Sequence, residues 1–325
     1  MLLPPDDIDV ARLRRAIASR YAVPETDALF VGLGEDSWAY WMGDLWISLR
    51  RDLRGHVPAA YETAYELRAA GLDFVLAPLA SCDGEIVGRI EGRPVVVFPF
   101  VPSEQLTLQS AAAAETELLV AMLEKVHATH VDLPLPTEDF QLGFGGELDG
   151  ALRFAHAGDR ETDDGYRRRL RGLLRLHDGY ITQLRSELGR LAEVCAGHGG
   201  DYVLTHGEPS AQNVLRHDGG LMIADWGSAA WGPPERDWFH LVRTLGIDAP
   251  EWRSEFLAFY QVKWILSEIT EYAVRFLEHR GPGDADDAAM RRRLTRYLPE
   301  PTQVDPGYEL AERTRDICLA LAAAR

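Results

Sequence analysis

The stretch of sequence that decides the fold lies between Thr205 and Leu241. It reads THGEPSAQNVL over Thr205–Leu215 and LMIADWGSAAWGPPERDWFHL over Leu221–Leu241. Short strand-like runs flank the turn residues His217–Gly220, and this pattern predicts a β-hairpin. A hairpin brings Asp225, which follows its second strand, beside Asn213, which precedes its first.

Three polar side chains meet at this predicted hairpin. The carboxylate of Asp225 and the amide oxygen of Asn213 are ligands that a hard divalent cation prefers. The carboxylate of Glu208, five residues before Asn213, is placed to accept a proton from a substrate hydroxyl. Phosphoryl transfer needs metal on the phosphates and an acidic residue that orients the nucleophile. The stretch therefore predicts a kinase site.

At these residues the sequence resembles the aminoglycoside phosphotransferase/choline kinase family. The family pattern HGDxxxxN, then a hydrophobic residue with DW or DF, then a further Asp, reads here as His206-Gly207-Glu208-x4-Asn213, Ala224-Asp225-Trp226 and Asp237. The HGEPxxxN form resembles an antibiotic-kinase-like subgroup. The resemblance implies an α+β, bilobal protein-kinase-like fold, with a small β-rich N-lobe and a larger helical C-lobe.

The resemblance also implies a role for each matched residue. Glu208 would be the catalytic base, although the family more often has Asp there. Asn213 and Asp225 would bind Mg²⁺ on ATP or GTP. Two residues would support the catalytic loop without touching substrate: His206 by packing, and Asp237 by binding backbone amides.

The nucleotide side departs from the family pattern, because the phosphate-binding lysine of the third strand is missing. Two alignments put Ser48 or Leu49 at its position, and the first 124 residues contain no lysine. Strand alternation puts Arg50 on the face of Ser48 and Arg51 on the face of Leu49, so one arginine is predicted to replace the lysine.

Other nucleotide contacts follow from the same resemblance. Gly34 and Ser37, in the first hairpin, would cover the phosphates. Phe98 and Phe100 flank the hinge expected at the nucleotide base, as core or stacking residues. The helix acid that pairs with the lysine in the family would be Glu62, or else Glu66.

The rest of the chain fits two lobes, which we place at residues 1–100 for nucleotide binding and 101–325 for the catalytic loop and substrate site. Strand-like runs are punctuated by Gly turns in the first hundred residues, with one inserted helix; after residue 102 helices dominate. The strands are expected at 28–31, 38–41, 45–49, 74–79, 85–90, 94–100, 202–205, 214–216 and 221–224. The helices are expected at 6–21, 58–70, 110–129, most of 164–193 and 252–278, with two more at the end.

Composition limits the partners. The net charge of −17 disfavours nucleic acid, which needs a basic face. No apolar run approaches the ~20 residues that cross a bilayer, and the acidic, proline-containing start does not match a signal peptide, so we expect a cytoplasmic protein without a membrane partner. The three cysteines are too scattered for a zinc site or disulfide framework.

The predicted function is transfer of the γ-phosphate of a nucleoside triphosphate to a hydroxyl of an antibiotic, either aminoglycoside-like or nucleoside, which would confer resistance. Two alternatives stay open: a metabolite kinase for choline, homoserine or an amino sugar, and a nucleotide-binding pseudokinase. Acceptor specificity is expected in 137–150 and 252–278, where Glu255, Glu268 and Glu271 either meet amines or face solvent.

Overall fold

The computed structural model describes residues 4–32, 37–107, 110–158, 165–198, 200, 202–247, 251–278 and 292–298. Gly34 and most of the region of the two predicted C-terminal helices lie outside these ranges. The chain packs as two compact units, one made of Met1–Glu138 with Asp201–Pro250 and the other of Asp139–Gly200 with Glu251–Arg325. The boundary predicted at residue 100 falls inside the first unit.

The first unit begins with an antiparallel five-stranded sheet in the order β1-β2-β3-β5-β4. Its strands are β1 (Leu29–Val31), β2 (Ser37–Met42), β3 (Leu45–Arg50), β4 (Val87–Ile90) and β5 (Arg93–Pro99). All five were predicted to within a few residues. The strand predicted at 74–79 is wrong: Val75 forms only an isolated bridge to Ile223. Pro78 has no N–H to donate to a ladder, and the segment donates one backbone hydrogen bond to each of two different strands, from Leu76 to Ile223 and from Leu79 to Val97.

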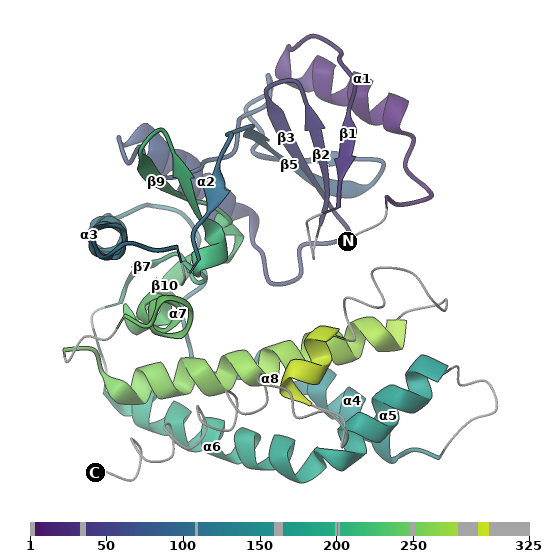
Figure 1. Cartoon of the computed structure of the whole chain (residues 1–325), viewed down its shortest axis with the longest axis vertical. Coiled ribbons are helices and arrows are strands. Elements are labelled where there is room, and N and C mark those ends of the chain that lie inside the picture. The colour runs from purple at the N-terminus through teal and green to yellow at the C-terminus, as the bar shows by residue number, and fades with distance from the viewer. Residues whose placement is uncertain are drawn as a thin grey trace. The chain divides into compact units, whose positions relative to one another are not determined.

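The two faces of this sheet carry different partners (Figure 1). Helix α1 (Val10–Tyr21) packs Leu13 and Ile17 on the face that presents Ile47 and Leu49. Helix α2 (Pro58–Ala69) packs on the other face, where Tyr61 contacts Val96 of β5. The alternation of β3 therefore sends Leu45, Ile47 and Leu49 to the core under α1, and Trp46, Ser48 and Arg50 to the face of α2.

The predicted catalytic hairpin is present in the same unit. Strands β8 (Val214–His217) and β9 (Gly220–Ile223) pair antiparallel, and β6 (Glu104–Gln105) adds a third strand. Strand β7 (Val203–Thr205) pairs with β10 (Ala230–Gly232). Helices α3 (Ala113–His127) and α7 (Glu235–Leu245) complete the unit, with the single turns η1 (Ala211–Asn213) and η2 (Trp226–Ser228) beside the hairpin.

The second unit is helical. The long α8 (Ser254–Glu278) packs against α4 (Gly145–His156), α5 (Gly165–Leu176) and α6 (Asp178–Gly197). Most of 164–193 is helical, as predicted; it forms two helices separated at His177, and two poor helix-interior residues, Asp178 and Gly179, follow the break. Helix α4 begins in the Gly-rich stretch for which no helix was predicted. None of the described helices has the length and apolar character to cross a membrane.

Candidate active site

The hairpin places the two predicted metal ligands side by side. The amide of Ala224 donates to the carbonyl of Asn213 at 2.8 Å, so Asp225 follows directly on the residue that pairs with Asn213. The Nδ2 of Asn213 donates to the carbonyl of Glu208 at 2.9 Å. Because that carbonyl can only accept, the amide nitrogen is fixed toward it and the amide oxygen is left to bind a cation.

Glu208 lies in the loop between β7 and η1 and is half-buried. Its Oε1 accepts a hydrogen bond from Nε2 of Gln212 at 3.1 Å. Its backbone carbonyl carries the Asn213 contact. Hydrogen bonds within the loop therefore connect the residue that carries the Glu208 carboxylate to the amide side chain of Asn213.

His206 is a fully buried residue of the same loop. Its Nδ1 accepts from the amide of Glu208 at 3.1 Å, and its Nε2 lies 2.9 Å from the carbonyl of Ala224, to which it donates. Burial lowers the pKa of His206, which agrees with a neutral ring that accepts at one nitrogen and donates at the other. The ring also meets Trp226 edge-on, with centroids 4.5 Å apart. His206 thus ties the loop to the end of β9.

Asp237, on α7, is the buried anchor of the loop. Its carboxylate accepts from the amides of His206 (3.0 Å) and Gly207 (2.7 Å) and from Nε2 of His127 (2.9 Å). Burial alone raises the pKa of Asp237, but the hydrogen bond and charge of His127 and the hydrogen bond from the Gly207 amide bring it to about 2. His127, on α3, was not anticipated from the sequence.

Replacing Asp237 with alanine is expected to lower the free energy of unfolding by about 3 kcal/mol or more, because three buried donors lose their acceptor at ~1–3 kcal/mol each. Urea denaturation measures the change, with exposed Asp83→Ala as the control. The folded pKa of Asp237 lies below its ordinary value of 3.8, so its contribution is full above that pH. The difference between variant and wild type should therefore narrow as the pH falls toward 2, and a constant difference contradicts the assignment.

Gly207 and Arg236 form a second link that sequence reasoning missed. Gly207 has φ +99°, and a Cβ there would lie 2.5 Å from a guanidinium nitrogen of Arg236. That guanidinium donates to Oγ1 of Thr205 and to the carbonyl of Ser228, both at 2.8 Å. Only glycine combines this backbone conformation with this close approach. Arg236 joins β7 to η2 through these two bonds.

On the sheet, β3 separates its two arginines. Arg50 is buried on the face of Ser48, toward α2, whereas Arg51 is exposed. The Arg50 guanidinium lies at the hydroxyl of Tyr61: burial raises the pKa of that hydroxyl, and the charge and hydrogen bond of Arg50 oppose the rise. Among the residues that the structure describes, no hydrogen bond or ion pair joins Arg50 to Glu62 or Glu66. The helix residue that meets the strand cation is therefore a tyrosine.

Aromatic side chains line the same face toward the predicted hinge. Phe100 packs on Trp41 and Trp46, with centroids 5.2 and 6.5 Å away, and its amide donates to the carbonyl of Asp44. Phe98 lies 6.5 Å from Tyr61. Both phenylalanines are half-buried, and Trp41 is 40% exposed. This surface has the composition of a stacking platform for a planar base. Ser37 begins β2.

The donor set fits a magnesium ion that arrives with a nucleotide. Within the described ranges, no three His, Cys, Asp or Glu side chains cluster as a metal site. Mg²⁺ is commonly held by one or two protein carboxylates together with substrate phosphates and water. The Asp225 carboxylate and the Asn213 amide oxygen match that pattern.

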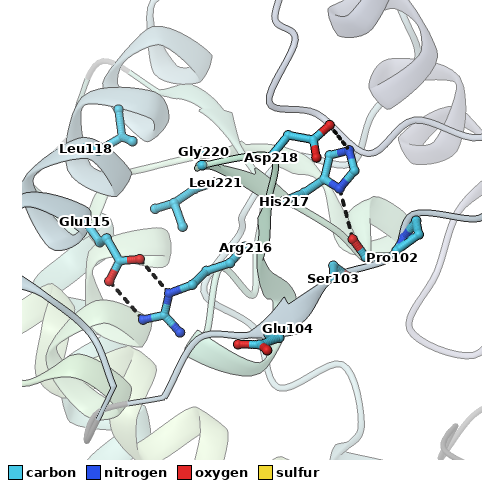
Figure 2. A pocket seen from close by; sticks show the side chains of 11 residues that line it. Pro102, Ser103, Glu104, Glu115, Leu118, Arg216, His217, Asp218, Gly220 and Leu221 are labelled. Atoms are coloured by element: carbon cyan, nitrogen blue, oxygen red, sulfur yellow. Dashed lines mark hydrogen bonds and ion pairs between the residues drawn. The ribbon is translucent and has the colours of Figure 1, made fainter.

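A separate cavity of 610 Å³ lies at the outer end of the β8–β9 hairpin (Figure 2). Two of the charged side chains that line the cavity form an ion pair: Arg216 donates from Nε to Oε1 of Glu115 at 2.5 Å and from Nη2 to Oε2 at 2.9 Å. Hydrogen bonds from Arg216 and from the Ala112 amide lower the pKa of Glu115 to about 2. The cavity contains none of the predicted catalytic residues. The Arg216–Glu115 pair fastens the hairpin to α3.

Known proteins share this sequence pattern and architecture. The family described as "Phosphotransferase enzyme family" matches residues 34–277. Protein StrN of Streptomyces griseus is 47% identical over 280 residues, which cover 84% of this chain and 86% of that protein.

Solved structures agree on the fold. A spectinomycin phosphotransferase, APH(9)-Ia, in complex with ADP and spectinomycin superposes with a TM-score of 0.74 at 17% identity, covering 95% of this chain and 99% of that one. Amicoumacin kinase hAmiN, in complex with AMP-PNP, Ca²⁺ and Ami, superposes with a TM-score of 0.56 at 14% identity, covering 93% of this chain and 97% of that one. A choline/ethanolamine kinase family protein from Mesorhizobium loti superposes with a TM-score of 0.52 at 16% identity, covering 95% of this chain and 99% of that one.

These matches confirm the α+β, protein-kinase-like fold that the catalytic stretch predicted. Three quarters of the chain lies within the family match, and the hairpin, Glu208, Asn213 and Asp225 all fall inside it. The protein therefore belongs to the phosphotransferase enzyme family.

Proposed function

We propose that this protein transfers the γ-phosphoryl group of ATP or GTP to a hydroxyl group of a small-molecule antibiotic. The observation that carries the proposal is the joint placement of Glu208, Asn213 and Asp225. One hydrogen-bonded loop and hairpin present a free amide oxygen, a carboxylate at the strand end and a second carboxylate at the mouth of the loop. That set can bind a metal nucleotide and orient a hydroxyl.

The roles follow from the chemistry of each group. Asn213 and Asp225 would hold Mg²⁺, which offsets negative charge on the phosphates when bound. Glu208 would accept the proton of the acceptor hydroxyl as the oxygen attacks phosphorus. His206 and Asp237 would keep the loop in shape, since each contacts the backbone and both are fully buried.

The sheet of the first unit would bind the nucleotide, in keeping with a nucleotide-binding role for residues 1–100. Phe98 and Phe100 lie where the base would stack. Ser37, Ser48 and Arg50 share the sheet face under α2, and Arg50 would supply the phosphate contact that a lysine makes elsewhere in the family. A guanidinium can make forked hydrogen bonds to phosphate oxygens.

Arg50→Ala should therefore raise the KM for nucleotide by about 10-fold or more, since a hydrogen bond to a charged group is worth ~1.5–3 kcal/mol. Arg51→Ala is the matched control, because Arg51 is the neighbouring arginine, lies just beyond the end of β3 and is exposed. Steady-state kinetics over a nucleotide series give both values. Equal KM values for the two variants and wild type would show that backbone amides and magnesium suffice.

The relatives support an antibiotic as acceptor. The spectinomycin phosphotransferase structure holds spectinomycin together with ADP, and the amicoumacin kinase structure holds Ami together with AMP-PNP. A second candidate is a metabolite kinase of the choline type, which the choline/ethanolamine kinase family structure favours. A pseudokinase is the third, because Glu208 replaces Asp and the lysine is absent, but the complete Asn213–Asp225 pair argues against it.

A nucleotide-consumption screen decides among these candidates. The full chain is incubated with Mg²⁺, with ATP or GTP, and with panels of aminoglycosides, nucleoside antibiotics, choline, homoserine and amino sugars. Mass spectrometry then identifies any product heavier by one phosphate. A phosphorylated antibiotic supports the proposal, a phosphorylated metabolite supports the second candidate, and nucleotide binding without transfer to any acceptor supports the pseudokinase.

A further inference from the structure

His56 lies outside the catalytic stretch, yet it packs directly against the loop that carries Asp225. A Cβ built on Gly227, two residues after Asp225, would lie 1.7 Å from Nδ1 of His56. The next residue, Val57, donates its amide to the carbonyl of Gly227 at 3.0 Å. Two consecutive residues just before α2 therefore hold the turn η2.

The His56 ring is also held by Tyr61. Its Nδ1 lies 2.8 Å from the Tyr61 hydroxyl, and the two rings stack with centroids 5.8 Å apart and planes 14° apart. Tyr61 is almost fully buried on the first turns of α2. The ring of His56 thus contacts both a buried helix residue and the backbone of the turn that follows Asp225.

The protonation states agree with this geometry. Burial, and then the charge of Arg50, lower the pKa of His56 to about 4, against the opposing charges of Asp225 and Asp52. The ring is therefore neutral at physiological pH and accepts at Nδ1 from Tyr61, which in turn receives a hydrogen bond from Arg50. A chain of hydrogen bonds runs from the strand cation through Tyr61 to the ring that touches Gly227.

The turn needs such support because of its backbone. Asp225 adopts φ 64° and ψ 59°, a left-handed conformation that aspartate and asparagine adopt more readily than other non-glycine residues but that still depends on neighbouring structure to fix it. Trp226 is fully buried on one side of the turn. His56 and Val57 fix Gly227 on the other.

We propose that His56 is a positioning residue that holds the Asp225 turn in its metal-binding conformation, through contact with Gly227 and with Tyr61 as its support. The inference rests on the proposed function, since it assigns to Asp225 the role of magnesium ligand. It adds a residue that has no counterpart in the catalytic motif. It also joins the two sides of the nucleotide site, because the same hydrogen-bonded chain begins at Arg50.

The test measures how much Mg²⁺ strengthens nucleotide binding. Isothermal titration calorimetry gives the Kd of AMP-PNP with Mg²⁺ and with EDTA, and the ratio of the two values is the magnesium gain. In His56→Ala this ratio is expected to be roughly 10–100-fold smaller than in the wild type, the usual cost of removing a residue that orients a metal ligand. The Kd in EDTA should change little. Thermal unfolding should confirm a folded variant, and exposed His156→Ala is the control.

Gly227→Ala provides an independent second arm. The added methyl group would displace the His56 ring, so the variant should lose magnesium gain in the wild-type background. In the His56→Ala background the same methyl group meets no ring and should cost nothing further. Non-additive losses of this kind separate a specific contact from general damage.

The possible results are distinct. A wild-type protein whose AMP-PNP affinity does not respond to Mg²⁺ overturns the proposed function, and the inference with it. A normal wild-type response that His56→Ala retains overturns the inference alone. A harmless Gly227→Ala, or losses that add in the double variant, would likewise overturn it.

Discussion

Asp225→Asn is expected to abolish phosphoryl transfer while leaving the fold intact. The substitution removes the one carboxylate of the Asn213–Asp225 pair, so the cation would have two neutral amide oxygens in place of a charged ligand. Asparagine is the replacement that best suits the backbone, because it tolerates the left-handed conformation found at Asp225. Alanine at this position would strain the left-handed backbone, so the loss of the carboxylate could not be separated from the effect of that strain. Turnover is measured with the acceptor found in the screen, and magnesium gain by calorimetry.

Asp218→Asn is a closely matched control for this variant. Asp218 also has a positive φ, 47°, and lies at the other end of the same hairpin, where its side chain is 86% exposed. It lines the cavity of Figure 2 and lies outside the proposed metal site. We expect Asp218→Asn to retain wild-type turnover. Near-normal turnover of Asp225→Asn would remove Asp225 from the catalytic site.

Glu208→Gln is expected to lower kcat by roughly 10²–10⁴-fold, the range for loss of a positioned base. Glutamine keeps the length and shape of the side chain and can still contact Gln212, so the loop should be preserved. Nucleotide KM should change little, because Glu208 faces the acceptor in the proposed arrangement. A variant that lost nucleotide affinity in place of kcat would indicate a metal-binding role for Glu208.

Two comparisons sharpen this result. Glu104→Gln, an exposed glutamate of β6, should leave kcat unchanged. Glu208→Asp restores the residue more common in the family and keeps a carboxylate on a shorter arm. It should therefore retain more activity than Glu208→Gln. Equal activity of the Gln and wild-type proteins would show that the proton leaves by another route.

The sequence predicted those parts of the site that depend on local order. The hairpin follows from the alternation of Val214–His217 and from the Asp218-Gly219 turn, so the approach of Asn213 and Asp225 could be foreseen. The same strand logic limited the lysine replacement to two arginines, and the backbone of β3 then places Arg50 under α2. Both predictions depend only on the alternation of residues that are close in the sequence, and that alternation can be read without the structure.

The parts that sequence reasoning missed depend on long-range packing. His127 reaches Asp237 from α3, and His56 reaches Gly227 from the segment before α2. His127 is the last residue of α3 and His56 lies in a loop, and a single histidine in either place gives no periodic signal. Glu62 was chosen as the partner of the strand cation by its residue type, whereas the register of α2 presents Tyr61. Only the three-dimensional arrangement could show which side of that helix faces β3.

The absence of lysine from the five-stranded sheet has a practical consequence for chemical labelling. The chain has two lysines, Lys125 in α3 and Lys263 in α8, and neither belongs to the five-stranded sheet. Arg50 of β3 presents a guanidinium group and offers no free amine. Acylating probes that mark kinases through a nucleotide-site lysine would therefore find no target in this sheet. Dicarbonyl reagents, which modify guanidinium groups, are the appropriate covalent probes, and protection by Mg²⁺ and AMP-PNP would report occupancy of the site.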